Sequence, residues 1–265
     1  MSRLSQFLSV AILAATLLLS RLTLEAWQTP GLPAPNSRLA GFPQIVLWAW
    51  ERPEDLSFID PRTVGIAFLA KTLYLRGEEV AVRPRLQPVQ VPTRTALMAV
   101  TRIESDLFKP PALSPIQRAK VVSVIEQLTH IPGIAAIQVD FDARASERAF
   151  YRDLLSDLRR QLPSTIGLSI TALASWCFYD NWLSGLPVDE VVPMLFRMGV
   201  DRQQIVFHLN AGAHFRPALC RQSVGVSTDE PRPRLPAGRR VYIFHPRSWS
   251  EETAHGILQE VRRWQ

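Results

Sequence analysis

The chain lacks most of the residues and motifs that mark common metal, redox and nucleotide sites. Its 265 residues include only two cysteines and no Cys-x-x-Cys or His-Glu-x-x-His pattern. Two cysteines exclude a small fold built on disulfides, and the missing patterns give no support for a metal site. The sequence also has no glycine-rich phosphate loop, dinucleotide fingerprint or Gly-x-Ser-x-Gly elbow. We therefore predict a protein that uses no metal and no cofactor.

Lysine is nearly absent, although the formal net charge is +6. Lys71, Lys109 and Lys120 are the only lysines among 30 basic residues. The arginines are scattered without interleaved aromatic residues, so the charge indicates a coding bias, and we predict no nucleic-acid partner. With 47% apolar residues the chain is not disordered, and its length suits one large domain.

The N-terminal residues predict export from the cytoplasm. Arg3 precedes a nearly uninterrupted apolar run over residues 7–19, which is typical of an export signal and short for a spanning helix. Because no clear cleavage site follows, residues 1–26 are either a removed signal or a retained N-terminal membrane anchor; a buried first helix is a third interpretation. Residues 27–41 are proline-rich and predict a spacer. We expect a periplasmic or membrane-tethered protein that contacts the membrane only if the segment is retained.

Short apolar runs recur through residues 42–265, which we interpret as a single domain. Continuous apolar runs are typical of strands covered on both faces, as in a parallel sheet. Eight such runs with helical patterns between several of them predict a (β/α)8 TIM-like barrel with some helices eroded. An open doubly wound sheet is the alternative. The predicted strands are 45–50, 64–69, 96–102, 135–141, 167–172, 191–196, 223–227 and 241–245.

The connections between these strands differ in kind. Ser114 followed by proline, Ser146, and the capping-box pattern over 248–251 each predict the start of a helix. Residues 72–91 alternate polar and apolar and predict a β-hairpin inserted after the second strand. Cys177 and Cys220 are free to pair in an oxidising compartment, and two buried thiols are the alternative.

Ionisable and indole side chains follow seven of the eight predicted strands. In a barrel of this class, the residues that do chemistry lie where strands end and loops begin. We therefore list as candidate catalytic residues the acids Asp140, Asp142, Asp229, Glu230 and Glu104, and as candidate substrate-binding residues Trp48, Trp50, Trp176, Arg102, Arg197 and His245.

Asp140 and Asp142 form the candidate pair of catalytic acids. Their spacing places both on one face of a strand, with Cα atoms about 6.5 to 7 Å apart. Cleavage of a glycosidic bond uses two carboxyl groups, one of which has a raised pKa. The alternative is structural, since a buried Asp140 that pairs with Arg102 would need no chemical role.

The chain resembles a family of uncharacterised bacterial exported proteins that is classed as a domain of unknown function. The residues that carry the resemblance are 47–56, 137–144, 146–148, 168–177, 186–190, 193–199 and 225–231. A more distant likeness is to chitinase-type (family 18) glycoside hydrolases, whose fourth strand carries Asp-x-x-Asp-x-Asp-x-Glu. The matching positions here are Ala135, Gln138, Asp140 and Asp142, so only Asp140 keeps the residue of the motif. The glutamate that donates the proton in that family is replaced by the shorter Asp142.

Two functions are compatible with these residues. The first is a glycoside hydrolase-like barrel with Asp142 as the general acid, Asp140 as its electrostatic partner and Asp229 or Glu230 across the mouth. Its partner would be a polysaccharide that stacks on the tryptophans. The second is a non-catalytic carbohydrate-binding or cell-envelope scaffold protein on a degenerate barrel. The sequence does not indicate the substrate or the oligomeric state.

Overall fold

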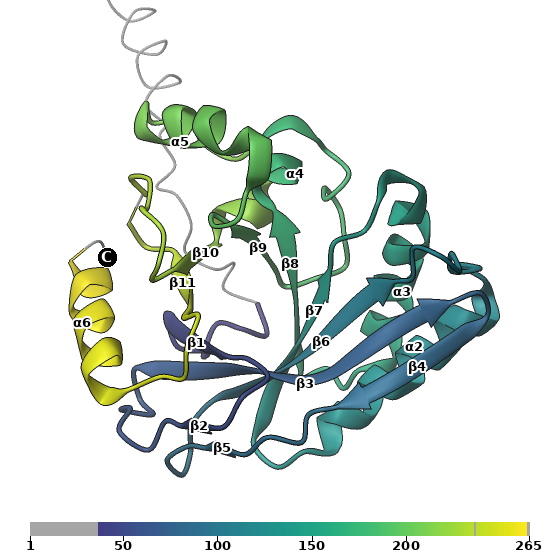
Figure 1. Cartoon of the computed structure of the whole chain (residues 1–265), viewed down its shortest axis with the longest axis horizontal. Helices are drawn as coiled ribbons and strands as arrows, with labels where there is room; N and C mark the ends of the chain where they lie inside the picture. The colour runs from purple at the N-terminus through teal and green to yellow at the C-terminus, as the bar shows by residue number, and fades with distance from the viewer. Residues whose placement is uncertain (1–36, 236, 264–265) are drawn as a thin grey trace, which may run out of the picture. The chain divides into compact units, whose positions relative to one another are not determined.

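Eight parallel strands form a closed barrel (Figure 1). The computed structural model describes residues 37–235 and 237–263, so the predicted export segment and most of the spacer lie outside it. The first strand, β1, pairs with both β11 and β3, and these two pairings close the sheet into a barrel. This confirms the predicted (β/α)8 architecture and excludes an open sheet. The strands are β1 (Ile45–Ala49), β3 (Val64–Arg76), β6 (Leu97–Ser105), β7 (Ile134–Phe141), β8 (Gly167–Leu173), β9 (Glu190–Met194), β10 (Ser223–Ser227) and β11 (Arg240–Phe244).

Alternate residues of each strand pack into two separate apolar layers. In β1, Val46 and Trp48 join a small cluster inside the barrel, whereas Ile45 and Leu47 join the larger cluster outside. The period of two in a strand produces this division. Because both faces are covered, the strands read as continuous apolar runs in the sequence.

The N-terminal end of the barrel is closed by side chains and a buried ion pair. Leu39 and Phe42 fill this end, and Arg240 donates to the carbonyl oxygens of both residues at 2.7 and 3.1 Å. Arg240 also pairs with Glu190 at 2.7 Å, and both side chains are buried. Residues that face inward at the opposite end of the barrel are therefore the ones that can reach a ligand.

The predicted hairpin is present and extends the barrel wall. β3 continues to Arg76, and β4 (Glu79–Pro84) pairs antiparallel with it. The buried Gln117 of α2 (Pro115–Glu126) donates to the carbonyl oxygens of Gly77 and Glu79, which holds the hairpin against that helix. β2 (Glu54–Asp55) and β5 (Val89–Gln90) form a separate two-stranded sheet.

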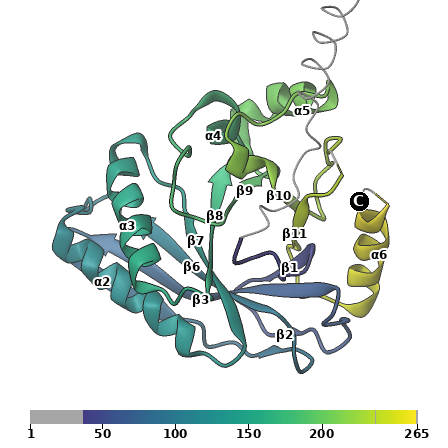
Figure 2. The ribbon, with the colours of Figure 1, turned by 180° about the vertical axis from the view of Figure 1, so that it is seen from behind.

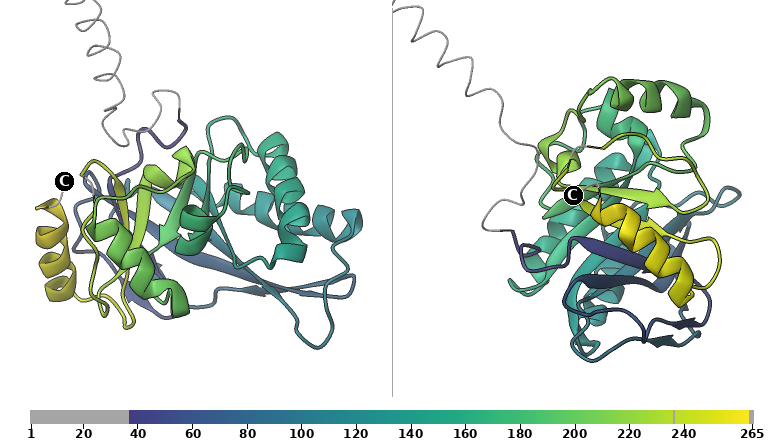
Figure 3. Two further views of the ribbon diagram at one scale, coloured as in Figure 1. Left: turned by 90° about the horizontal axis from the view of Figure 1, so that it is seen from above. Right: turned by 90° about the vertical axis from the view of Figure 1, so that its left-hand side faces the viewer.

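Five α-helices lie outside the strands in the part of the chain that the structure describes. α2 and α3 lie side by side when the barrel is seen from behind (Figure 2), and Arg118 of α2 pairs with Asp153 and Asp157 of α3. Two further views show α5 and α6 on the outside of the barrel (Figure 3). The helices are α2 (Pro115–Glu126), α3 (Arg148–Gln161), α4 (Ala174–Tyr179), α5 (Arg202–Asn210) and α6 (Glu251–Arg262).

Two of the three predicted helix starts are displaced, the cap of α3 by one residue and that of α6 by two. Ser114 caps α2 by accepting from the amide of Gln117, as predicted. Ser146 instead lies within a 3-10 turn before α3, where the Glu147 carboxylate accepts from the amide of Arg144. α6 is capped by Ser250, which accepts from the amide of Thr253, and Ser248 bonds elsewhere.

Cys177 and Cys220 form a disulfide, which settles the two alternatives that the sequence left open. The bond joins α4 to the 3-10 turn Ala218–Arg221 that precedes β10. It therefore fixes the segment that follows β8. Within residues 37–235 and 237–263, no helix combines the length and the apolar character that crossing a membrane requires.

Candidate functional site

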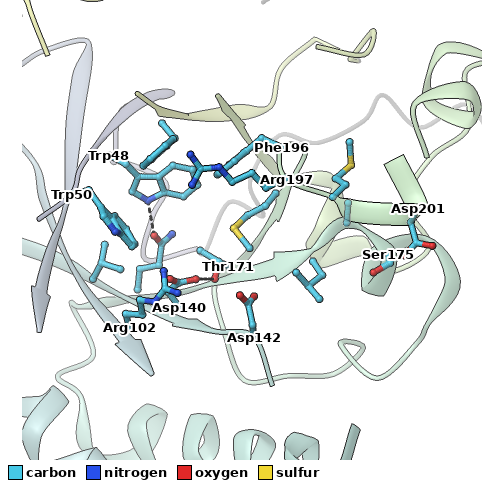
Figure 4. Close-up of a pocket in the computed structure, with 17 residues that line it drawn as sticks. Trp48, Trp50, Arg102, Asp140, Asp142, Thr171, Ser175, Phe196, Arg197 and Asp201 are labelled. Carbon is cyan, nitrogen blue, oxygen red and sulfur yellow. Dashed lines mark hydrogen bonds between the residues drawn. The ribbon is translucent and has the colours of Figure 1, made fainter. Parts of the chain in front are cut away.

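A pocket of about 380 Å³ opens at the carboxyl ends of the barrel strands (Figure 4). Charged side chains come from β6, from β7 and the residue after it, and from the residues that follow β9. An aromatic wall comes from β1 and the residue after it, from β11 and from the residues that follow β9. The lining residues are Trp48, Trp50, Val100, Arg102, Gln138, Asp140, Asp142, Thr171, Leu173, Ala174, Ser175, Met194, Phe196, Arg197, Met198, Asp201 and Phe244.

Asp140 is the buried acid of the pocket. Its Oδ1 accepts a 2.6 Å hydrogen bond from the Thr171 hydroxyl on the neighbouring strand β8. Burial, with a smaller effect of the nearby Asp142 charge, raises the pKa of Asp140 to about 6 against the opposing effects of Thr171 and Arg102. The carboxyl therefore gains or loses its proton close to neutral pH.

Asp142 lies two residues further along the chain, at the solvent-exposed part of the pocket. Figure 4 shows its carboxyl pointing toward the pocket centre. Partial desolvation raises its pKa, and the Arg102 charge opposes that effect. Arg102 is itself held by Glu104, whose carboxylate accepts from Nε at 2.7 Å. Asp140, Asp142 and Arg102 thus form one electrostatically coupled group.

Trp48 is the most buried ring of the aromatic wall, and residues inside the barrel fix its position. Its Nε1 donates a 2.9 Å hydrogen bond to Oε1 of Gln138, whose amide donates in turn to Ser169. Gly225 provides the space for the ring, because a Cβ atom there would lie 2.8 Å from Trp48 Cη2. Trp48 is only 4% exposed, so only an edge of its indole ring faces the pocket.

Three aromatic rings of the wall are partly exposed. Phe196 and Phe244 stack with ring centroids 5.6 Å apart and an interplanar angle of 3°. Trp50 meets Phe244 edge to face at 6.3 Å. Such a wall offers flat apolar faces opposite the two aspartates.

Six of the eleven predicted site residues line this pocket, and five do not. The six are Asp140, Asp142, Arg102, Trp48, Trp50 and Arg197. Glu104 lies beside the pocket as the partner of Arg102. Trp176 is buried outside the barrel against Trp182.

The remaining predicted residues are held by neighbours at the ends of β10 and β11. His245 is buried, with Nδ1 2.6 Å from the Thr228 hydroxyl. Asp229 accepts from the Ser227 hydroxyl, and this bond lowers its pKa. Glu230 accepts from the amide of Arg197 at 3.0 Å and pairs with Arg202.

Besides Gln138, three polar residues of the pocket were not predicted as site residues from the sequence. Thr171 had a usable signal, because it faces inward two residues after Ser169, beside the strand that carries Asp140. Ser175 and Asp201 come from α4 and from the turn before α5, where no strand pattern marks them. No group of three or more acidic, histidine or cysteine side chains in the described residues is placed to hold a metal ion.

Residues 93–196 match the model of a family described as a domain of unknown function, DUF3142. This confirms the predicted resemblance to a domain of unknown function over that part of the chain. The matched residues run from the approach to β6 to the residues just after β9, so they include Arg102, Asp140, Asp142 and Thr171. The predicted segments 47–56 and 225–231 lie outside the match. No curated protein matches the sequence.

Among solved structures, the chain is similar to the spore cortex-lytic enzyme SleL of Bacillus cereus. The TM-score is 0.46 and the sequence identity is 18%. The superposition covers 69% of this chain and 50% of that one, so this chain spans half the length of the enzyme.

Proposed function

We propose that the protein is an exported, glycoside hydrolase-like enzyme that acts on an extracytoplasmic polysaccharide, with this pocket as its active site. The observation that carries the proposal is the placement of Asp140 and Asp142 in one open pocket opposite an aromatic wall. Glycosidic bond cleavage needs a carboxyl group that keeps its proton near neutral pH beside one that is ionised. Burial raises the pKa of both carboxyls, that of Asp140 to about 6, so the pair keeps one proton near that pH. In the reactive form that we propose, this shared proton lies on Asp142 and Asp140 is ionised.

Asp142 is the general acid in this proposal, because its carboxyl lies in the solvent-accessible part of the pocket. Asp140 is its electrostatic partner. When one of two neighbouring carboxyl groups is ionised, its charge makes ionisation of the other less favourable. The pair therefore keeps one proton at pH values above the usual pKa of aspartate. Arg102 balances the charge of the ionised member.

The reaction follows from this arrangement. Asp142 donates its proton to the glycosidic oxygen as the bond from that oxygen to the anomeric carbon breaks. Ionised Asp140 stabilises the positive charge that develops on the sugar ring. Water then adds to the anomeric carbon and returns a proton to the Asp142 carboxylate. The bond is hydrolysed and the acid is restored.

The aromatic wall binds the sugar in this proposal. Trp50, Phe196 and Phe244 are partly exposed and provide faces on which sugar rings stack, while Trp48 supports them from behind. The five predicted residues outside the pocket are not needed for this role. In particular, Asp229 and Glu230 are engaged by Ser227 and Arg202, so we assign neither as a second acid.

An extracytoplasmic site of action is supported by two independent features. The first is the export pattern of the N-terminal sequence. The second is the Cys177–Cys220 disulfide, because disulfides persist mainly in oxidising compartments.

A screen of the purified protein tests this function. Wild type and Asp142→Asn are incubated with a panel of bacterial and plant polysaccharides, and new reducing ends are counted. We expect product from wild type and little from Asp142→Asn. Equal turnover by both proteins would contradict the assignment of Asp142. Glycan binding without any product would instead support the non-catalytic carbohydrate-binding or scaffold function.

A further inference from the structure

We propose that the polysaccharide substrate carries carboxylate groups, as uronic acid units do, and that Arg197 binds one of them in the pocket. This inference rests on the proposed function, since it names the substrate class of the same site. It is carried by the backbone of Arg197, by the contacts that hold that backbone, and by the surroundings of its guanidinium.

The backbone of Arg197 is strained where it enters the pocket. Its φ angle is 52°, in the left-handed region that non-glycine residues rarely occupy. Among the described residues, Arg94 and Leu113 are the other non-glycine positions with positive φ, and neither lines the pocket. Such strain persists where surrounding contacts enforce it and gathers at functional sites.

Glu230 is the residue that enforces this conformation. Its Oε1 accepts the amide hydrogen of Arg197 at 3.0 Å, and its other carboxylate oxygen pairs with Arg202 of α5. The carboxylate therefore ties the residue after β9 to the helix that follows. This contact assigns Glu230, which lies outside the pocket, as a positioning residue for Arg197.

The guanidinium of Arg197 is directed along the aromatic wall. Its Cζ atom lies 5.1 Å from the centroid of the Phe244 ring, which is itself stacked on Phe196. Figure 4 shows the side chain running beside Phe196 toward Trp48, on the other side of the pocket from Asp140 and Asp142. A cation held over a ring face keeps a fixed direction.

The two arginines of the pocket differ in their partners. Arg102 is bound to Glu104 and faces the two aspartates. Arg197 makes no side-chain hydrogen bond to any described residue; the acid that feels its charge is Asp229, whose pKa it helps to lower. Its planar fork of N–H groups is therefore available to a ligand that stacks on the wall.

A single carboxylate is the ligand group that fits this cation. A guanidinium binds a carboxylate through two parallel hydrogen bonds. A doubly charged group such as a phosphate ester is disfavoured, because the ionised member of the Asp140–Asp142 pair also lines the pocket and repels two negative charges more strongly than one. Uronic acid units present one carboxylate on each sugar ring, beside the faces that would stack on Trp50 and Phe244.

The test compares acidic oligosaccharides with their own methyl esters. Oligogalacturonate, oligomannuronate and hyaluronan fragments are each titrated into the protein beside the esterified form, which has the same rings and linkages without the charge. A neutral cellulose oligomer serves as a further probe. The variants are Arg197→Gln, Glu230→Ala, Glu230→Gln and Arg94→Gln. Arg94 is a matched control, because it is an exposed arginine with φ 68° that precedes β6 at the opposite end of the barrel.

We expect at least one acidic oligomer to bind wild type about tenfold to a hundredfold more tightly than its ester. Arg197→Gln removes this difference, whereas Arg94→Gln leaves it unchanged. Glu230→Ala reduces the difference without weakening ester binding, and Glu230→Gln, which keeps an acceptor for the Arg197 amide, restores part of it.

Two results would overturn the inference. One is equal binding of acid and ester by wild type, and the other is a preference for the acid that survives Arg197→Gln. Tight binding of the neutral oligomer in either case would leave the proposed function standing without this substrate class. Failure of every acidic and neutral glycan to bind would overturn both.

Discussion

The hydroxyl of Thr171 donates a 2.6 Å hydrogen bond to Oδ1 of Asp140, and this bond joins strands β8 and β7 inside the pocket. It favours the ionised form of a carboxyl group that burial favours in the protonated form. Because the two effects oppose each other, Asp140 titrates near pH 6. The pocket thus contains an acid whose charge changes near pH 6.

Thr171→Val raises the pKa of Asp140 above its value of about 6, because the hydrogen bond that stabilises the carboxylate is lost. Titration of the aspartate carboxyl carbons by NMR measures this change. Thr101→Val is the matched control, since Thr101 is buried in β6 and its hydroxyl has no partner among the described residues. A shift of the same size in both variants would show that Thr171 has no specific effect.

Asp140→Asn changes how stability depends on pH. The folded-state pKa of about 6 lies above the ordinary aspartate value of 3.8, so the wild-type carboxyl favours the folded state at low pH. That contribution is lost as the pH rises from about 4 through 6. Asparagine can still accept from Thr171 and carries no charge, so the variant avoids the loss. We expect the two proteins to be similar at pH 4 and the variant to be more stable at pH 7.5, by roughly 3 kcal/mol at most.

Urea unfolding of both proteins across this pH range measures the difference. A gap between wild type and Asp140→Asn that does not vary with pH would contradict the raised pKa. A variant that becomes less stable relative to wild type as the pH rises would contradict the sign.

Reduction of the Cys177–Cys220 disulfide lowers the unfolding free energy. The bond links residues separated by 43 positions, and closing a loop of that size is worth about 2 to 4 kcal/mol through the unfolded chain. Dithiothreitol is therefore expected to destabilise wild type and to leave the double variant Cys177→Ala, Cys220→Ala unchanged. An equal response of both proteins would show that the two cysteines are not paired in solution.

The barrel could be predicted because its strands are buried on both faces. The runs at 135–141 and 223–227 are apolar for that reason, and the first of them also carries Gln138 and Asp140 toward the barrel interior. The hairpin over 72–91 was visible because apolar residues alternate with others on both sides of Gly77, at Leu73, Leu75, Val80 and Val82. Helix starts were less secure, since Ser248 and Ser250 are both acceptable caps and only tertiary contacts select between them.

Site residues that lie on strands could be predicted from the sequence. Those whose position depends on the conformation of a loop or turn could not. Asp140 and Arg102 follow from the period of two on neighbouring strands. Trp50 and Trp176 look equivalent in the sequence, yet Trp176 turns outward at the start of α4 and packs on Trp182. Asp201 enters the pocket from a turn seven residues after β9 ends, where no periodic pattern marks it.

The most direct test of the proposed chemistry is kcat/KM for the polysaccharide that wild type cleaves, measured for wild type and Asp142→Asn beside the Kd of each. Loss of a general acid lowers kcat/KM by about a hundredfold to ten-thousandfold. We predict a fall in that range with Kd changed by less than about threefold, because Asp142 acts on the leaving oxygen and the aromatic wall does the binding. Unchanged kcat/KM in Asp142→Asn, or parallel losses of kcat/KM and binding, would contradict the assignment of Asp142 as the catalytic acid.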